Sequence, residues 1–168
     1  LTKPSMLAHL LKYDTAQGGY CGKIGEALHT VSADDEANTI TVDGKTLKIY
    51  AEKDAKDLPW GEIGVDVVLE CTGFYTSKAK SQAHIDAGAK KVVISAPAGN
   101  DLPTIVYSVN EKTLTADDTI ISAASCTTNC LAPMAKALND YAPIQSGIMS
   151  TIHARSEEHT SELQSRSA

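Results

Sequence analysis

The segment from residue 65 to residue 95 constrains the fold most, because it alternates between two kinds of apolar pattern. Val65–Glu70 is a short apolar run rich in β-branched residues, Ser77–Ala87 has helical spacing and ends at Gly88, and Lys91–Ser95 is again strand-like. Strand, helix and strand within about 30 residues form a βαβ unit, whose mostly apolar strands suit a parallel sheet buried on both faces. The segment therefore predicts an α/β protein.

The first fifty residues add a helix and a hairpin. Pro4–Tyr13 combines a proline suited to a first helical turn with apolar residues at helical spacing, and Gly18-Gly19 follows as a break. Thr39–Tyr50 alternates apolar and polar residues around Asp43-Gly44, a pair suited to the positive φ of a tight turn. We therefore predict a helix followed by a hairpin with one solvent-facing side.

Two strands and a helix are predicted in the last third of the chain. Thr119–Ala123 is a short apolar run, and it leads into a segment whose apolar residues fall on one helical face through Asn139. Gly147–His153 is strand-like and ends on a histidine. These elements extend the α/β pattern as far as Ala154.

The overall charge argues against some classes of binding partner. The 168 residues carry a formal net charge of −6, which argues against nucleic acid or an anionic membrane surface, because those partners select an excess of Lys and Arg. No apolar stretch reaches the roughly 20 residues of a membrane-spanning helix, and no signal-peptide layout opens the chain. A small soluble partner is expected, for one domain or one domain plus part of another.

The four cysteines do not form the dense framework of a small secreted domain, so they indicate free thiols in a reducing cytoplasm. Cys126 and Cys130 lie on one helical face. Zinc sites and redox disulfides, however, usually leave two residues between their cysteines, and zinc needs further ligands. No metal site is therefore predicted, and Cys130 is expected to face the core as a small apolar residue.

Cys126 is the candidate nucleophile, because it stands between a predicted strand and the helix that follows. A thiol attacks carbonyl carbon only as thiolate, and the start of a helix stabilises negative charge. His153 ends a predicted strand, where functional side chains of parallel sheets meet, so it is the candidate base. The residues alone also allow a core cysteine and a hydrogen-bonded strand-end histidine.

Several segments resemble phosphorylating glyceraldehyde-3-phosphate dehydrogenases. The most specific is Ala124–Pro133 (ASCTTNCLAP), followed downstream by Thr151–Ala154 (TIHA). The others are Leu1–Asp14 (LTKPSMLAHLLKYD), Val65–Phe74 (VDVVLECTGF) and Ala87–Pro97 (AGAKKVVISAP). The resemblance implies an incomplete Rossmann-like fold with a mainly parallel sheet and helices, in a partial NAD-binding domain at 1–125. The start of a second, α+β catalytic domain would follow at 126–154.

The resemblance also implies roles for individual residues. Cys126 would attack the aldehyde of glyceraldehyde 3-phosphate, with its own N–H helping to stabilise the oxyanion. His153 would activate the thiol and assist proton removal. Residues that match positions holding inorganic phosphate are Ser125 and Thr127, and residues that match cofactor-contacting positions are Thr72, Gly73, Phe74 and Ser95. Without the resemblance, these last four would be an ordinary turn, a core aromatic and a strand terminus.

The implied enzyme is a cytoplasmic homotetramer of glycolysis. It would use NAD, form a thioester on its cysteine and release 1,3-bisphosphoglycerate. The sequence contains neither the Gly-X-Gly-X-X-Gly turn for the pyrophosphate nor the acidic residue for the adenosine ribose, so NAD rather than NADP is expected from the family alone. Two alternatives stay open: the related erythrose-4-phosphate dehydrogenase, and a non-catalytic binding module in which Cys126 is merely buried.

The two ends of the chain suggest a piece of a longer enzyme. The chain begins with Leu1, and residues 155–168 hold a single large apolar residue and resemble the translation of a sequencing-library adapter. We expect a non-native tail at 155–168, with an ordinary polar tail or a short surface helix as the alternative. Little turnover is expected from this chain, because positioning contributes about 7 to 11 kcal/mol to catalysis.

Overall fold

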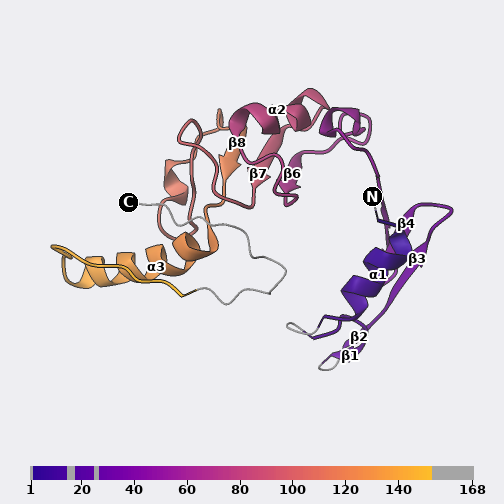
Figure 1. Cartoon of the computed structure of the whole chain (residues 1–168), viewed down its shortest axis with the longest axis horizontal. Coiled ribbons are helices and arrows are strands. Elements are labelled where there is room, and N and C mark those ends of the chain that lie inside the picture. The colour runs from indigo at the N-terminus through magenta and orange to yellow at the C-terminus, as the bar shows by residue number, and fades with distance from the viewer. Residues whose placement is uncertain (1, 15–17, 25–26, 153–168) are drawn as a thin grey trace.

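The computed structural model describes residues 2–14, 18–24 and 27–152. Its helices are α1 (Pro4–Lys12), α2 (Lys78–Asp86) and α3 (Cys126–Tyr141), with short 3₁₀ turns η1 (Ala55–Asp57) and η2 (Glu111–Thr113). Its strands are β1 (Gly22–Ile24), β2 (Ala27–His29), β3 (Val31–Asp34), β4 (Thr39–Val42), β5 (Lys45–Lys48), β6 (Val67–Glu70), β7 (Lys91–Ile94) and β8 (Ile120–Ser122). Figure 1 shows two groups of elements, α1 with the first strands and α2 with β6 to β8.

The first group is a helix packed on an antiparallel sheet. The strands of this sheet follow the order β3-β4-β5, and Ala8 of α1 packs with Val31 and Ile40 in a small buried cluster. The predicted helix and hairpin are confirmed. Asp43 and Gly44 have φ values of 49° and 78°, the left-handed conformations that a two-residue turn between antiparallel strands needs.

The strands β1, β2 and β3 were not predicted from the sequence. The first two pair with each other in a separate antiparallel ribbon, and β3 adds a strand beside β4. His29, which was expected in a polar connection, is the last residue of β2. These strands contain only two β-branched residues, Ile24 and Val31, so they lack the strand-like composition of β4 and β7.

The second group contains the predicted βαβ unit. Strands β6, β7 and β8 are parallel and neighbour one another in that order. Ser77 caps α2 by accepting the N–H of Lys80, which satisfies one of the free donors at the helix start. The helix ends before Gly88, which has a φ of 105°, a conformation that glycine adopts readily and that is sterically strained for other residues. The predicted α/β class with a parallel sheet is confirmed.

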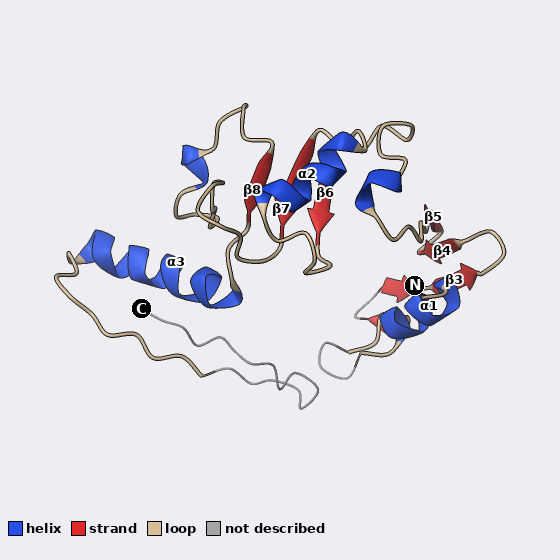
Figure 2. Cartoon of the chain, turned by 45° about the horizontal axis from the view of Figure 1, so that its top comes forward, coloured by secondary structure: helices blue, strands red, loops and turns tan. Residues whose placement is uncertain are grey.

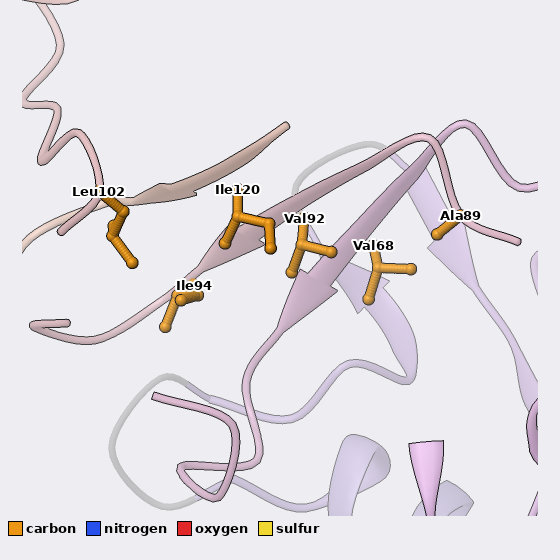
Figure 3. Packing of buried hydrophobic residues seen from close by; sticks show 6 residues of the cluster. All are labelled: Val68, Ala89, Val92, Ile94, Leu102 and Ile120. Carbon is orange, nitrogen blue, oxygen red and sulfur yellow. The ribbon is translucent and has the colours of Figure 1, made fainter. Parts of the chain in front are cut away.

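The main hydrophobic core lies on one face of this sheet. Figure 3 shows its members side by side on the three strands and the adjoining loops: Val68, Ala89, Val92, Ile94, Leu102 and Ile120. Val92 and Ile94 are completely buried, and Ile85 of α2 packs against the cluster. In Figure 2, α2 lies across the strands.

The opposite face of the sheet differs from the prediction. We expected burial on both faces, but Val67 and Leu69 of β6 are 49% and 69% exposed. Side chains alternate between the two faces of a strand, so these two point away from the core that surrounds Val68. Within the part of the chain that the structure describes, α2 covers the face that carries the core.

The C-terminal part also differs from the prediction. Helix α3 forms, but none of its residues is buried, so its apolar face is exposed. The predicted strand at Gly147–His153 is wrong for residues 147–152, which have no regular secondary structure, and Ile148 and Ile152 are exposed. A strand needs a hydrogen-bonding neighbour, and the three described sheets contain none for this segment. No helix in the described ranges is long and apolar enough to cross a membrane.

Candidate active site

The candidate site residues follow the carboxyl ends of three parallel strands. The register pairs Glu70 of β6 with Ile94 of β7, and Ile94 with Ser122 of β8, so these strand ends form one row. Thr72 lies two residues after Glu70, Ser95 lies one residue after Ile94, and Cys126 lies four residues after Ser122. The edge outside the carboxyl ends of a parallel sheet is where ligands bind in α/β folds.

At the end of β6, a buried carboxylate organises the segment that follows. Glu70 is 2% exposed, and its Oε1 accepts the N–H of Thr72 at 2.7 Å and also the Thr72 hydroxyl. The same hydroxyl oxygen accepts the N–H of Phe74 at 3.1 Å. Gly73 has a φ of 78°, and a Cβ added there would meet nothing within 4 Å. The backbone turns sharply here and faces open space.

The Phe74 side chain is directed outward. It is 76% exposed, so the alternative of a core aromatic is wrong. A cavity of about 530 Å³ is lined by Thr72, Phe74 and Tyr75 together with Glu70 and His84. An exposed aromatic ring beside a cavity of this size is typical of a small-molecule site.

The ends of β7 and β8 are tied to each other and to β6. Ser95 is exposed, and its N–H donates to the carbonyl of Glu70 at 2.9 Å. Ser122 is completely buried, and its hydroxyl donates to the carbonyl of Ala96 at 2.8 Å while it accepts the N–H of Ala124 at 3.0 Å. The hydroxyl thus links the two strand ends directly below the cysteine turn.

The turn into α3 has an unusual backbone. Ala124 has a φ of 63°, a left-handed conformation that non-glycine residues adopt at a cost of about 1 kcal/mol or more. The side chain of Asn129 stabilises this turn, because its Nδ2 donates to the carbonyls of Ala123 at 2.7 Å and Ser125 at 2.9 Å. These two hydrogen bonds lie on either side of Ala124, in the turn that places Cys126 at the first position of α3.

Ser125 is the N-cap of this helix. Its Oγ accepts the N–H of Thr128 at 3.0 Å and lies 2.8 Å from the Thr128 hydroxyl. A cap of this kind stabilises a helix start by about 1 kcal/mol. The phosphate-binding roles of Ser125 and Thr127 stay predictions, and both residues are half-buried beside the helix start.

All four cysteines are free and exposed. The exposure of Cys126 contradicts the alternative of a core cysteine. The expectation that Cys130 faces the core is also wrong, because α3 has no buried residue for it to join. Among the described residues, no group of three or more His, Cys, Asp or Glu side chains is placed to hold a metal ion.

The structure brings the predicted residues to one sheet edge with one exception. Thr72, Gly73 and Phe74 follow β6, Ser95 follows β7, and the cysteine turn follows β8. In Figure 2, α3 begins on the side of the sheet toward which the arrow of β6 points. His153 lies outside the described residues, so its pairing with Cys126 stays a prediction.

Three supporting residues escaped sequence analysis: Glu70, His84 and Asn129. Each is polar and acts through another residue of the edge, and such contacts have no periodic signal. A charged residue that ends an apolar strand was the one sign available for Glu70.

Models of two domains of one enzyme family match the chain. Residues 1–78 match "Glyceraldehyde 3-phosphate dehydrogenase, NAD binding domain", and residues 125–166 match "Glyceraldehyde 3-phosphate dehydrogenase, C-terminal domain". The second match begins at the N-cap of α3.

Curated proteins give the same result. The chain is 64% identical over 155 residues to a glyceraldehyde-3-phosphate dehydrogenase of Lactobacillus delbrueckii subsp. bulgaricus, 58% over 154 residues to one of Clostridium pasteurianum, and 50% over 155 residues to one of Streptococcus pyogenes. Each alignment covers 92% of this chain, but only 43% to 44% of the relative. The chain therefore spans less than half the length of these relatives.

Proposed function

Because the chain belongs to the glyceraldehyde-3-phosphate dehydrogenase family, we propose that it carries the cysteine nucleophile and the nicotinamide side of the cofactor site of such an enzyme. The proposed reaction of the whole enzyme oxidises glyceraldehyde 3-phosphate to 1,3-bisphosphoglycerate, with NAD and inorganic phosphate. One observation carries the proposal: Cys126 is exposed at the first position of a helix that starts directly beyond a parallel strand.

The proposed chemistry starts at the sulfur of Cys126. Sγ bonds to the aldehyde carbon of the substrate, and the carbonyl electron pair moves to oxygen, which gives a thiohemiacetal. The positive end of α3 favours negative charge, so it supports both the attacking thiolate and the resulting oxyanion. His153 is proposed to take the thiol proton and to return it to the oxyanion, which completes the thiohemiacetal. It is then proposed to take the same proton back from the thiohemiacetal hydroxyl when the hydride leaves.

The same residues support release of the product. NAD, held by the residues beyond β6 and β7, would supply the hydride acceptor, and loss of a hydride from the substrate carbon would leave a thioester on Cys126. A phosphate oxygen then bonds to the thioester carbon, the carbon–sulfur bond breaks, and the thiolate leaves. Ser125 and Thr127 are proposed to hold that phosphate, beside a helix start that favours anions.

The edge beyond β6 and β7 fits a nicotinamide cofactor. Phe74 offers an exposed ring, Gly73 leaves open space for a close approach, and Thr72 lines the adjoining cavity. The exposed Ser95 follows the neighbouring strand. These residues would hold the nicotinamide end of NAD. The whole enzyme is further proposed to be a cytoplasmic homotetramer.

The alternatives have less support. The relatives reported above are all named glyceraldehyde-3-phosphate dehydrogenase, which does not support erythrose 4-phosphate as the substrate. A binding module with a merely buried Cys126 does not agree with the exposure of this residue.

Thiol labelling tests the proposal directly. The 168-residue chain is treated with a limiting amount of iodoacetamide at neutral pH, and the alkylation rate of each cysteine is followed by peptide mass spectrometry. Since all four cysteines are exposed, accessibility does not separate them, and Cys21, Cys71 and Cys130 serve as internal controls. Cys126 should react about tenfold faster than the others, because a helix start stabilises its thiolate.

A second measurement tests the substrate. The chain is incubated with glyceraldehyde 3-phosphate and NAD without inorganic phosphate, so that any thioester is not released. Because little turnover is expected from this chain, the experiment looks for a single slow acylation. We expect the mass of a 3-phosphoglyceroyl group on the peptide that contains Cys126, and none on a Cys126→Ser variant. Equal alkylation of all four cysteines together with no acylated peptide would overturn the proposed function.

A further inference from the structure

Glu70 receives hydrogen bonds from two sides at the end of β6. Its Oε1 accepts the N–H and the hydroxyl of Thr72, and its Oε2 lies 2.9 Å from Nε2 of His84. Glu70 and His84 are 2% and 5% exposed, so water does not compete for these contacts. A carboxylate taken out of water is costly unless donors satisfy it, and here three donors do so.

The protonation of His84 follows from its other neighbour. The indole Nε1–H of Trp60 lies 3.2 Å from Nδ1 of His84, and an indole nitrogen can only donate. Nδ1 is therefore the acceptor, and Nε2 carries the proton that it donates to Glu70. The chain of donors runs from Trp60 through His84 and ends at the carboxylate.

We propose that Glu70 is a positioning residue that fixes the cofactor loop, defined as residues 72–74. This inference rests on the proposed function, which places the nicotinamide end of NAD against this loop. The carboxylate holds Thr72 by two bonds, and the Thr72 hydroxyl holds the N–H of Phe74, so one buried group sets two of the three loop residues. All three residues are exposed, and Thr72 and Phe74 flank Gly73, whose φ is positive. The bonds to Glu70 therefore supply the order that burial does not.

Glutamine is the discriminating substitution at position 70. It matches glutamate in shape but replaces one acceptor oxygen by an NH₂ donor. That NH₂ must face either the two donors of Thr72 or the Nε2–H of His84. His84 cannot change tautomer to accept it, because Nδ1 already faces the Trp60 donor. Glu70→Gln therefore breaks a hydrogen bond that Glu70 makes to Thr72 or to His84, and it does so without creating a cavity.

The experiment compares Glu70→Gln with Glu62→Gln in the 168-residue chain. Glu62 is exposed, so the second variant makes the same chemical change outside the network. Three quantities are measured: amide hydrogen exchange of residues 72–74, NADH affinity by fluorescence, and the alkylation rate of Cys126. A Thr72→Val variant and the double variant with Glu70→Gln complete a double-mutant cycle, which measures the coupling between the two residues.

We expect Glu70→Gln to speed exchange in the cofactor loop and to weaken NADH binding, each about tenfold, because a hydrogen bond to a charged group is lost. The Cys126 rate should stay within about twofold, since the hydrogen bonds of Glu70 described above go to Thr72, His84 and Ser95 and not to the cysteine turn. Thr72→Val should add little further loss in the double variant. Glu62→Gln should match the unmodified chain in all three measurements.

Two results would overturn the inference. One is unchanged hydrogen exchange in the cofactor loop. The other is a loss that spreads equally to Cys126 and to the global unfolding temperature, which would make Glu70 merely structural. If the unmodified chain does not bind NADH, the cofactor part of the proposed function fails for this chain. The positioning role of Glu70 is then tested by hydrogen exchange of the cofactor loop alone.

Discussion

The two faces of the parallel sheet should respond very differently to the same loss of side-chain atoms. Ile94 on β7 is completely buried, whereas Leu69 on β6 is 69% exposed. Isoleucine and leucine are isomers, so Ile94→Ala and Leu69→Ala remove the same number of carbon atoms. The pair therefore separates burial from side-chain size.

The structure sets the expected magnitudes. Removing three buried carbons from Ile94 costs about 2.4 kcal/mol at about 0.8 kcal/mol for each group, and a residual cavity raises this toward 5 kcal/mol. Leu69 hides about a third of its surface, so its removal costs about 0.8 kcal/mol on the same scale. Isoleucine also has the higher β propensity, so this contribution adds to the difference in the same direction. Ile94→Ala should be less stable than Leu69→Ala by about 1.5 kcal/mol or more.

The assay is urea unfolding followed by tryptophan fluorescence. Trp60 is the only tryptophan of the chain and packs against the core cluster that contains Ile94. Its signal therefore reports on unfolding of the group that holds the candidate site. The midpoint and the slope give the free energy of unfolding for each variant.

Equal destabilisation by the two variants, within about 0.5 kcal/mol, would refute the reasoning. It would mean that Leu69 is as well buried in solution as Ile94. The sequence-based expectation of a sheet buried on both faces would then be correct.

Two further predictions concern the first group of elements and the α2 terminus. The hydrogen bond from His29, with others from a backbone N–H and a tyrosine hydroxyl, lowers the pKa of Asp43 from 3.8 to about 2. Asp43 thus stabilises the fold above its unfolded pKa and loses this contribution as pH falls from about 5 to about 2, so acid unfolding should be less steep in Asp43→Asn. Gly88→Ala should cost about 1 to 3 kcal/mol in the urea assay, because φ is 105° and the new Cβ would lie 2.5 Å from the Gly61 Cα. Gly147→Ala is the control, since its Cβ meets nothing within 4 Å, and an equal loss in both variants would contradict the steric argument.

Local pattern was sufficient for the elements with strong periodicity. The elements of the βαβ unit, the first helix and the hairpin turn at Asp43 all lie where the sequence predicted them, because the pattern of each single element lies within about ten residues. The strand predicted at Gly147–His153 failed for the residues that the structure describes. Its apolar and β-branched residues suit a strand, but a strand also needs a hydrogen-bonding partner, and composition says nothing about whether one is present.

Some residues of the candidate site were also predicted from the sequence, and others were not. The resemblance identified Cys126, and strand order then placed its turn at the edge that also carries Thr72 and Ser95. The polar groups behind that edge could not be found in the sequence. The bond between Glu70 and His84 joins residues fourteen positions apart, and its direction depends on Trp60, another twenty-four positions from the histidine.

The sequence by itself determined the kinds of elements, their order, and the family to which the cysteine segment belongs. These properties are local, since periodicity, capping residues and motif spacing are all written within a few turns of chain. Only the tertiary structure decided which face of the sheet holds the core, that Cys130 and the apolar side of α3 are exposed, and which donors satisfy Glu70. Burial and hydrogen-bond satisfaction depend on which distant segments meet, and that is a property of the folded chain.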